Sequence, residues 1–146
     1  QYTMLNNFLA TFAALLISLL VIDSNIVVGQ TSSTQIETQL EGLRTTLAQS
    51  FGTEGSTVEV VLVEHILTIS RLNSYLNDGS HVDRNDEAVS IASVIQREVS
   101  GKPELKDVLI IRVQYILNVK DSAEKKVIDM IEFRKNQSGM FEFHST

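Results

Sequence analysis

The most prominent pattern in the chain is an apolar run near its N-terminus. Residues Phe8 to Ile22 read FLATFAALLISLLVI, and only a threonine and a serine interrupt the apolar side chains. From Met4 onward the uncharged stretch would rise about 28 Å as a helix, close to the roughly 30 Å of a bilayer's hydrocarbon layer. Apolar residues surround this helix instead of forming one stripe. The run therefore predicts a helix that contacts membrane lipid or neighbouring apolar helices.

Three interpretations of this segment remain open. A cleaved signal peptide has its small-residue site at Val27 and Gly29, which would make Gln30 the new N-terminus, but no Lys or Arg precedes Arg44 to form a basic start. A filament subunit of the pilin type would bury the helix against copies of itself. We expect the third, a retained single-pass transmembrane helix, because the chain carries the whole segment.

After the apolar segment, residues 1–29, and a linker at residues 30–33, residues 34–146 are expected to form one domain. Its first element is an amphipathic helix, because apolar residues recur at spacings of three and four: Ile36, Leu40, Leu43, Leu47 and Phe51. Thr34 and Glu37 have the spacing of a capping box at the start of this helix, and Gly52 fits a cap at its end.

Residues 57–72, TVEVVLVEHILTISRL, predict β-structure because they are rich in β-branched residues and contain no Gly or Pro. Sixteen residues is long for one strand, so the segment is either a bent strand or a hairpin that turns at Glu64 and His65. We favour the hairpin, although the Asn-Gly pair that would make its turn secure is absent.

A polar loop at residues 77–87 is expected to lead into a second amphipathic helix. Asp83 or Asn85 would cap its start, whereas Gly101 and Pro103 mark its end. Its apolar face carries Ala88, Ile91, Ala92, Ile95 and Val99.

The last third of the chain alternates between apolar and polar residues, as strands do. In residues 107–119 one side is wholly apolar and should face the core: Leu109, Ile111, Val113, Tyr115, Leu117 and Val119. Residues 126–135 and 140–144 follow as two strands joined by a hairpin. The predicted fold is α+β, a mainly antiparallel sheet covered on one face by two amphipathic helices, without long crossovers of the doubly wound type.

Composition excludes several classes of function. The 146 residues contain no cysteine, so disulfides, thiolate metal sites and cysteine nucleophiles are excluded. With 18 acidic and 12 basic residues the net charge is -6, which argues against a nucleic-acid partner. No motif of a nucleophile, a phosphate loop or a cofactor site occurs, so we expect no enzyme and no cofactor, although a catalytic site assembled from distant residues stays open.

The candidate metal ligands also lack a recognisable spacing. His65, His81 and His144 form no HxH or HExxH pair, so we expect unrelated histidines and no metal. The polar loop offers oxygen ligands, but counted from Asp78 its sixth position is not Gly and its twelfth is not Glu, as an EF-hand requires. Asn136-Gln137-Ser138 is only a weak match to a glycosylation acceptor.

A protein partner or self-assembly is the expected interaction. Five residues are candidates for a docking surface near the sheet edge: Tyr75, Met130, Met140, Phe141 and Phe143. The alternative is that Phe141 and Phe143 share one face and complete the core. We therefore expect a membrane-tethered interaction or accessory domain, exported with its C-terminal domain on the extracytoplasmic side. Its alternatives are a filament subunit, a secreted small-ligand-binding domain and an enzyme with a nonlocal site.

Overall fold

The structure is a computed structural model that describes residues 33–51, 58–118 and 123–144. Contacts divide the chain after Glu37, and the fold described here is that of the unit Thr38–Thr146. A helix at residues 33–50 comes first. It is followed by β1 (Val58–Val63), β2 (Ile66–Leu72), the 3-10 helix η2 (Tyr75–Asp78), α2 (His81–Ser100), the 3-10 helix η3 (Pro103–Leu105), β3 (Ile110–Asn118), β4 (Lys125–Lys135) and β5 (Phe141–His144).

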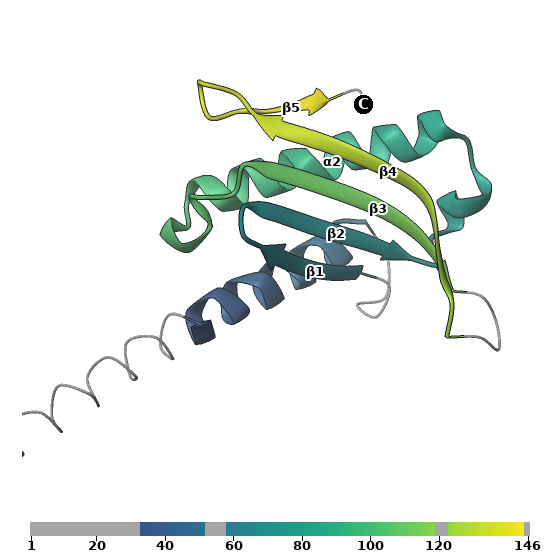
Figure 1. Ribbon diagram of the computed structural model, residues 1–146, viewed down its shortest axis with the longest axis horizontal. Coiled ribbons are helices and arrows are strands. Elements are labelled where there is room, and N and C mark those ends of the chain that lie inside the picture. Colours follow the sequence, from purple (N-terminus) through teal and green to yellow (C-terminus); the bar gives the residue numbers. More distant parts are fainter. Residues whose placement is uncertain (1–32, 52–57, 119–122, 145–146) are drawn as a thin grey trace, which may run out of the picture. The chain divides into compact units, whose positions relative to one another are not determined.

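The strands form one mixed sheet in the order β1-β2-β3-β4-β5 (Figure 1). Three neighbouring pairs are antiparallel, whereas β2 and β3 are parallel and are connected through α2. The α+β class is confirmed, but the expectation that the sheet has no long crossover is wrong. The 20 residues of α2 span about 30 Å, enough to return the chain to the end where β2 began, so the next strand runs parallel to it.

The hairpin predicted within residues 57–72 is confirmed. Val63 pairs with Ile66, and Glu64 in the turn between them adopts a positive φ of 53°. The carbonyl oxygen of His65 accepts hydrogen bonds from the backbone N–H groups of Leu109 (2.9 Å) and Ile110 (3.1 Å). The turn is therefore held against the start of β3, and these bonds offset the cost of the left-handed residue.

The starts of both helices differ from the sequence prediction. Thr34 is already helical and so is not the N-cap of its helix, while Gly52 lies outside the described residues. Helix α2 begins at His81, earlier than predicted, because its N-cap is Ser80 and neither Asp83 nor Asn85. The hydroxyl of Ser80 accepts from the N–H of Asp83, whose carboxylate accepts from the N–H of Ser80. Because of this capping box, the last residues of the predicted loop, from His81 onward, belong to the helix. The predicted end at Gly101 is confirmed.

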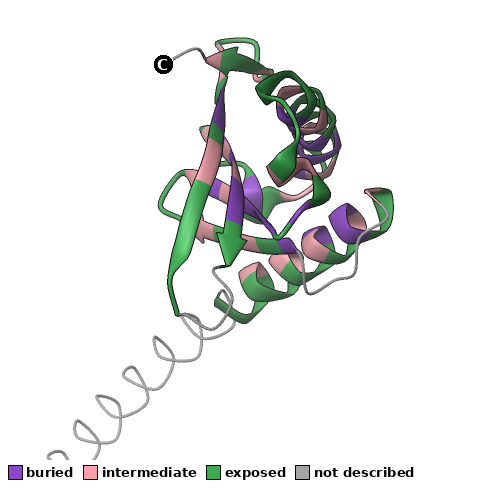
Figure 2. Ribbon diagram, turned by 90° about the vertical axis from the view of Figure 1, so that its right-hand side faces the viewer, coloured by how far each residue is buried: buried purple, intermediate pink, exposed green. Residues whose placement is uncertain are grey.

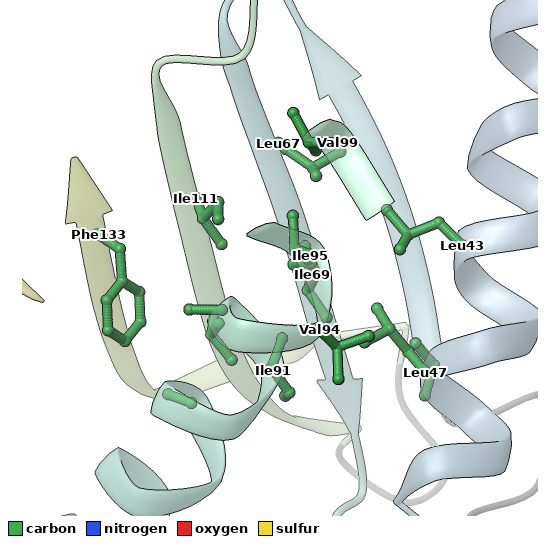
Figure 3. Packing of buried hydrophobic residues seen from close by; sticks show 14 of the residues in the cluster. Leu43, Leu47, Leu67, Ile69, Ile91, Val94, Ile95, Val99, Ile111 and Phe133 are labelled. Atoms are coloured by element: carbon green, nitrogen blue, oxygen red, sulfur yellow. The ribbon is translucent and has the colours of Figure 1, made fainter. Parts of the chain in front are cut away.

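Both helices lie on the same face of the sheet (Figure 2). Their apolar residues meet those of the strands in a single core, part of which is shown in Figure 3: Leu43, Leu47, Leu67, Ile69, Ile91, Val94, Ile95, Val99, Ile111 and Phe133. The predicted inner side of β3 is confirmed at Ile111, Val113 and Tyr115, all fully buried. Leu109 and Leu117 were predicted to face the core, but they lie at or beyond the ends of this strand and are exposed.

A register shift changes which face part of β4 presents. Tyr115 pairs with Asp129, but Ile116 pairs with Val127, so Ile128 is an extra residue between them. A bulge of this kind reverses the side to which the following residues point. Val127, which by strict alternation would share the core face with Ile131, therefore lies on the opposite face and is half exposed.

Within the described residues, no helix is long and apolar enough to cross a membrane. The segment predicted to do so, Phe8 to Ile22, lies outside these residues, as does the linker up to residue 32.

Candidate functional site

The face of the sheet opposite the helices is not covered by any described element (Figure 2). We call it the open face. Its register places residues of all five strands side by side, and four large apolar side chains are about half exposed on it: Val61, Val63, Val127 and Met130. A solvent-facing side of such a sheet is ordinarily polar, so these side chains are a candidate contact surface.

The centre of the open face carries paired charges. Glu132 is buried, and its carboxylate lies 2.6 Å from an Nη atom of Arg112 and 3.8 Å from one of Arg134. Arg112 also donates from Nε at 2.8 Å. Because its counter-charges are in place, this carboxylate needs no further ligand. The candidate contact surface on the open face is therefore its exposed apolar side chains and not this charged centre.

A second surface is an apolar groove of about 880 Å³ between α2, the β4–β5 hairpin and the end of the first helix. We call it the groove. Its lining consists of Ser50, Phe51, Val89, Ser90, Ala92, Ser93, Val94, Gln96, Arg97, Phe133, Met140, Phe141 and Phe143. The volume of the groove and the composition of its lining lie in the range of small-molecule sites, which are mainly apolar with a few polar groups.

The groove unites only part of the predicted docking set. Met140, Phe141 and Phe143 line it, but Met130 lies on the open face and Tyr75 lies in η2. Phe141 is half-buried and packs against the core, as the core interpretation has it. Phe143 is 53% exposed, and its ring meets that of Phe133 in the core edge to face, with the ring centroids 6.1 Å apart. The two phenylalanines therefore have different roles.

Gln96 of α2 closes part of the sheet edge beside the groove. Among the described strands, β5 pairs only with β4 and forms an edge of the sheet. The Oε1 atom of Gln96 accepts from the N–H of Phe141 (3.0 Å), and its Nε2 atom donates to the carbonyl of Gly139 (3.3 Å). The side-chain amide thus occupies the backbone N–H of the first residue of β5 and a carbonyl of the turn that precedes it. Such capping disfavours pairing with a further strand at this end of β5.

The groove has a one-sided charge. Among its lining residues Arg97 is the only charged one, and none is acidic, although the whole chain carries a net charge of -6. No hydrogen bond or ion pair within the described part of the chain engages the Arg97 guanidinium. Lys135 adds a second cation nearby, since its Nζ lies 5.3 Å from the centroid of the Phe141 ring.

A buried polar cluster beneath α2 was missed by the sequence analysis. Arg71 of β2 is 1% exposed, and its Nε donates to Glu87 of α2 at 2.8 Å. The hydroxyl of Tyr115 lies 3.1 Å from the same carboxylate and 2.8 Å from the backbone oxygen of Arg84. Burial, and then the charge of Glu87, raise the pKa of Tyr115 above its usual range. The two-residue period that places Arg71 in phase with Leu67 and Ile69 was the signal for its burial.

A second set of charged groups joins the start of α2 to β4. Asp129 accepts from Nε of Arg84 at 2.8 Å, and Nδ1 of His81 lies 2.7 Å from the same oxygen. Burial by itself would raise the pKa of Asp129, but the hydrogen bonds from Arg84, from His81 and from the backbone N–H of Met130 outweigh it, so the pKa is lowered. Both sets of charges tie α2 to the sheet, and neither Tyr115 nor Asp129 lines the groove.

The predicted polar and titratable candidates lie in separate elements. His65 is in the β1–β2 turn, His81 starts α2 and His144 lies in β5. Across the described ranges, no group of three or more His, Asp or Glu side chains is arranged to hold a metal ion. The predicted loop ligands Asp83 and Glu87 are engaged in the helix cap and with Arg71.

The side chain of Asn136, the glycosylation candidate, is used within its own turn. Its Oδ1 accepts from the backbone N–H groups of Ser138 (2.9 Å) and Met140 (3.0 Å), and its Nδ2 donates to Glu142 (2.6 Å). These bonds stabilise the turn that leads into β5 and give Asn136 a structural role.

Comparisons with known proteins add no assignment. The chain matches no protein-family model. A search of curated proteins also gives no match.

Proposed function

We propose that the protein is a non-enzymatic, membrane-tethered interaction or accessory domain. The apolar run Phe8 to Ile22 would be the tether, with the length and the all-round apolar character that a membrane span needs. The α+β domain would lie on the extracytoplasmic side and bind a protein partner there, as a subunit of a membrane complex does.

The observation that carries this proposal is the apolar character of the open face. Val61 and Val63 are 50% and 62% exposed on the edge strand β1, and Met130 and Val127 are similarly exposed on β4. Single exposed apolar residues are common on protein surfaces, but several on one uncovered sheet face favour a docking partner. Support for a non-enzymatic role comes from Tyr115 and Asp129, two of the residues whose pKa values are shifted, because both are engaged in contacts that hold α2 to the sheet.

The test is to replace Val61 and Met130 together by Lys in the full-length chain. Both side chains are about half exposed, so the thermal unfolding midpoint should change little, whereas two charges on the open face should abolish association with a partner. The measurement is the amount and identity of protein that co-purifies from detergent-solubilised membranes.

The matched control is Val82→Lys, because Val82 is 65% exposed on α2 and does not belong to the open face. This variant should retain the partner. Equal recovery of partner with the double variant and with the natural chain would contradict docking at the open face.

A further inference from the structure

The groove differs from the open face because it is a hollow of about 880 Å³ whose lining carries a single type of charge. Aromatic and aliphatic side chains contributed by Phe51, Val89, Met140 and Phe143 form much of its surface. Two other depressions in the described part of the chain, of about 510 and 630 Å³, are smaller and include acidic residues. The groove therefore suits an apolar ligand better than either of them.

Three of the groove residues that α2 contributes follow one line along the helix. Val89, Ser93 and Arg97 are spaced four residues apart, so they lie on one stripe of the helix, and all three line the groove. From Val89 to Arg97 the helix rises about 12 Å. The stripe thus passes from an apolar end through a hydroxyl to a guanidinium, which is the order of groups along an amphiphile.

The charge of the groove selects the head group of that amphiphile. A guanidinium binds a carboxylate through parallel hydrogen bonds, and one positive charge balances one negative charge. A phosphate dianion would need a second cation beside Arg97, and the Nζ atom of Lys135 already donates to the backbone oxygen of Lys106 at 3.0 Å. Ammonium amphiphiles would meet Arg97 and the nearby Lys135 and be repelled.

We propose that the groove binds a free long-chain carboxylate of the fatty-acid class. The apolar chain packs against Val89, Met140 and Phe143, and the carboxylate pairs with Arg97. The capping of the hairpin by Gln96 agrees with this occupant, because an amphiphile makes side-chain contacts and needs no strand edge.

The test uses fluorescence, because the natural chain contains no tryptophan. Phe143→Trp in the full-length chain, held in a non-ionic detergent at pH 8, places a single reporter in the groove. Titration with n-dodecanoate, below the concentration at which it forms its own micelles, should change the emission saturably. Adding Arg97→Gln to this variant should weaken binding about tenfold or more, since a charge-assisted hydrogen bond is lost.

Two controls separate this binding from partition into detergent or into the apolar N-terminal run, and a third checks that each variant folds. Val61→Trp places the reporter on the open face and should show no saturable change. Dodecyltrimethylammonium has the same chain with the opposite charge and should bind at least about tenfold more weakly. Circular dichroism of each variant checks that the domain is folded, and Met140→Trp replaces the reporter if Phe143→Trp is not.

The possible results each decide the matter. A saturable change that depends on Arg97 and on the carboxylate supports the proposal. Equal affinity for the two amphiphiles would show a groove that accepts any apolar chain, and unchanged binding with Arg97→Gln would assign Arg97 to the helix C-terminus alone; either result overturns it. The absence of a saturable change from the reporter in the groove, whether Phe143→Trp or its replacement Met140→Trp, would also overturn the proposal.

Discussion

At the scale of single residues, the charged side chains on the helix-covered face act in pairs. Arg71 and Glu87 are 1% and 9% exposed as side chains, so each is removed from water and depends on its counter-charge. Such a pair contributes little net stability compared with apolar residues of the same volume, but breaking it is costly because one charge stays buried. Its role is to fix the position of α2 on β2.

This asymmetry gives a double-mutant prediction. Glu87→Gln should lower the free energy of unfolding by about 3–5 kcal/mol, because the buried Arg71 loses its counter-charge. Arg71→Met combined with Glu87→Leu should be markedly less destabilising than Glu87→Gln alone. Urea unfolding of the three chains measures both effects, and equal losses in the single and double variants would contradict a buried pair.

Asp129 predicts a specific dependence of stability on pH. Its pKa is lower in the folded chain than in the unfolded chain, where it is about 3.9. The resulting stabilisation is fully present above the unfolded value and is lost as the pH falls through the folded value, because the unfolded state then binds the proton first. Unfolding measured between pH 6 and pH 2 should show this loss in the natural chain.

Asp129→Asn is the matching control for this titration. It removes the titrating group, so the loss of stability below about pH 4 should become smaller, while Arg84 and His81 lose their anionic partner at every pH. If both chains lost the same amount of stability at low pH, other carboxylates would be the cause of the acid unfolding.

At the scale of elements, local patterns predicted the strands well, and their assembly less well. The alternation in residues 107–119 identified the inner side of β3, and the β-branched run identified the β1–β2 hairpin, because both signals are contained within one segment. The crossover was missed because a single βα unit between two hairpins leaves no repeating pattern in the chain. The bulge at Ile128 was missed for a similar reason, since the register of β4 depends on its partner β3.

The candidate surfaces were predictable only in part. Phe141 and Phe143 were found by their alternation near a sheet edge, but the remaining groove residues come from α2 and from the end of the first helix. Arg97 and Gln96 occur in an unremarkable polar stretch of the helix. Their roles depend on the hairpin that packs beside them, which is tertiary information that no local pattern contains.

The inner side of β3 provides a prediction about folding of the domain alone. A fragment beginning at Gln30 should be soluble and unfold cooperatively, because the described core lies within residues 43–133. Val113 is fully buried on this side, so Val113→Asp should cost several kcal/mol, of the order of a small domain's whole stability. The comparison is the melting temperature of the two fragments, and Val61→Asp, on the open face, serves as the exposed control.

At the scale of the whole molecule, the apolar run and the folded domain make different demands on their surroundings. The domain has an apolar core of its own, whereas a helix that is apolar on every side cannot bury its surface against itself and needs lipid or other apolar helices around it. In the proposed function the tether and the interaction surface are therefore separable, and the open face would meet its partner only in the membrane plane to which the tether confines it. Confinement raises the effective concentration of a membrane partner, so even a weak contact at the open face would suffice.

This separation leads to the last prediction, which concerns the native protein in its own membranes. A retained transmembrane helix should keep the full chain in the membrane pellet through a carbonate wash and release it only with detergent, because carbonate removes peripheral proteins but does not extract a span of about 28 Å. Mass spectrometry of the purified native protein should then find Phe8 to Ile22 in the chain. A soluble protein beginning near Gln30 would instead establish the signal-peptide interpretation, and a large assembly held together without lipid would establish the filament interpretation. In both of those cases the open face would meet its partner without a tether, and its contact would have to be strong enough to act from solution or within the assembly.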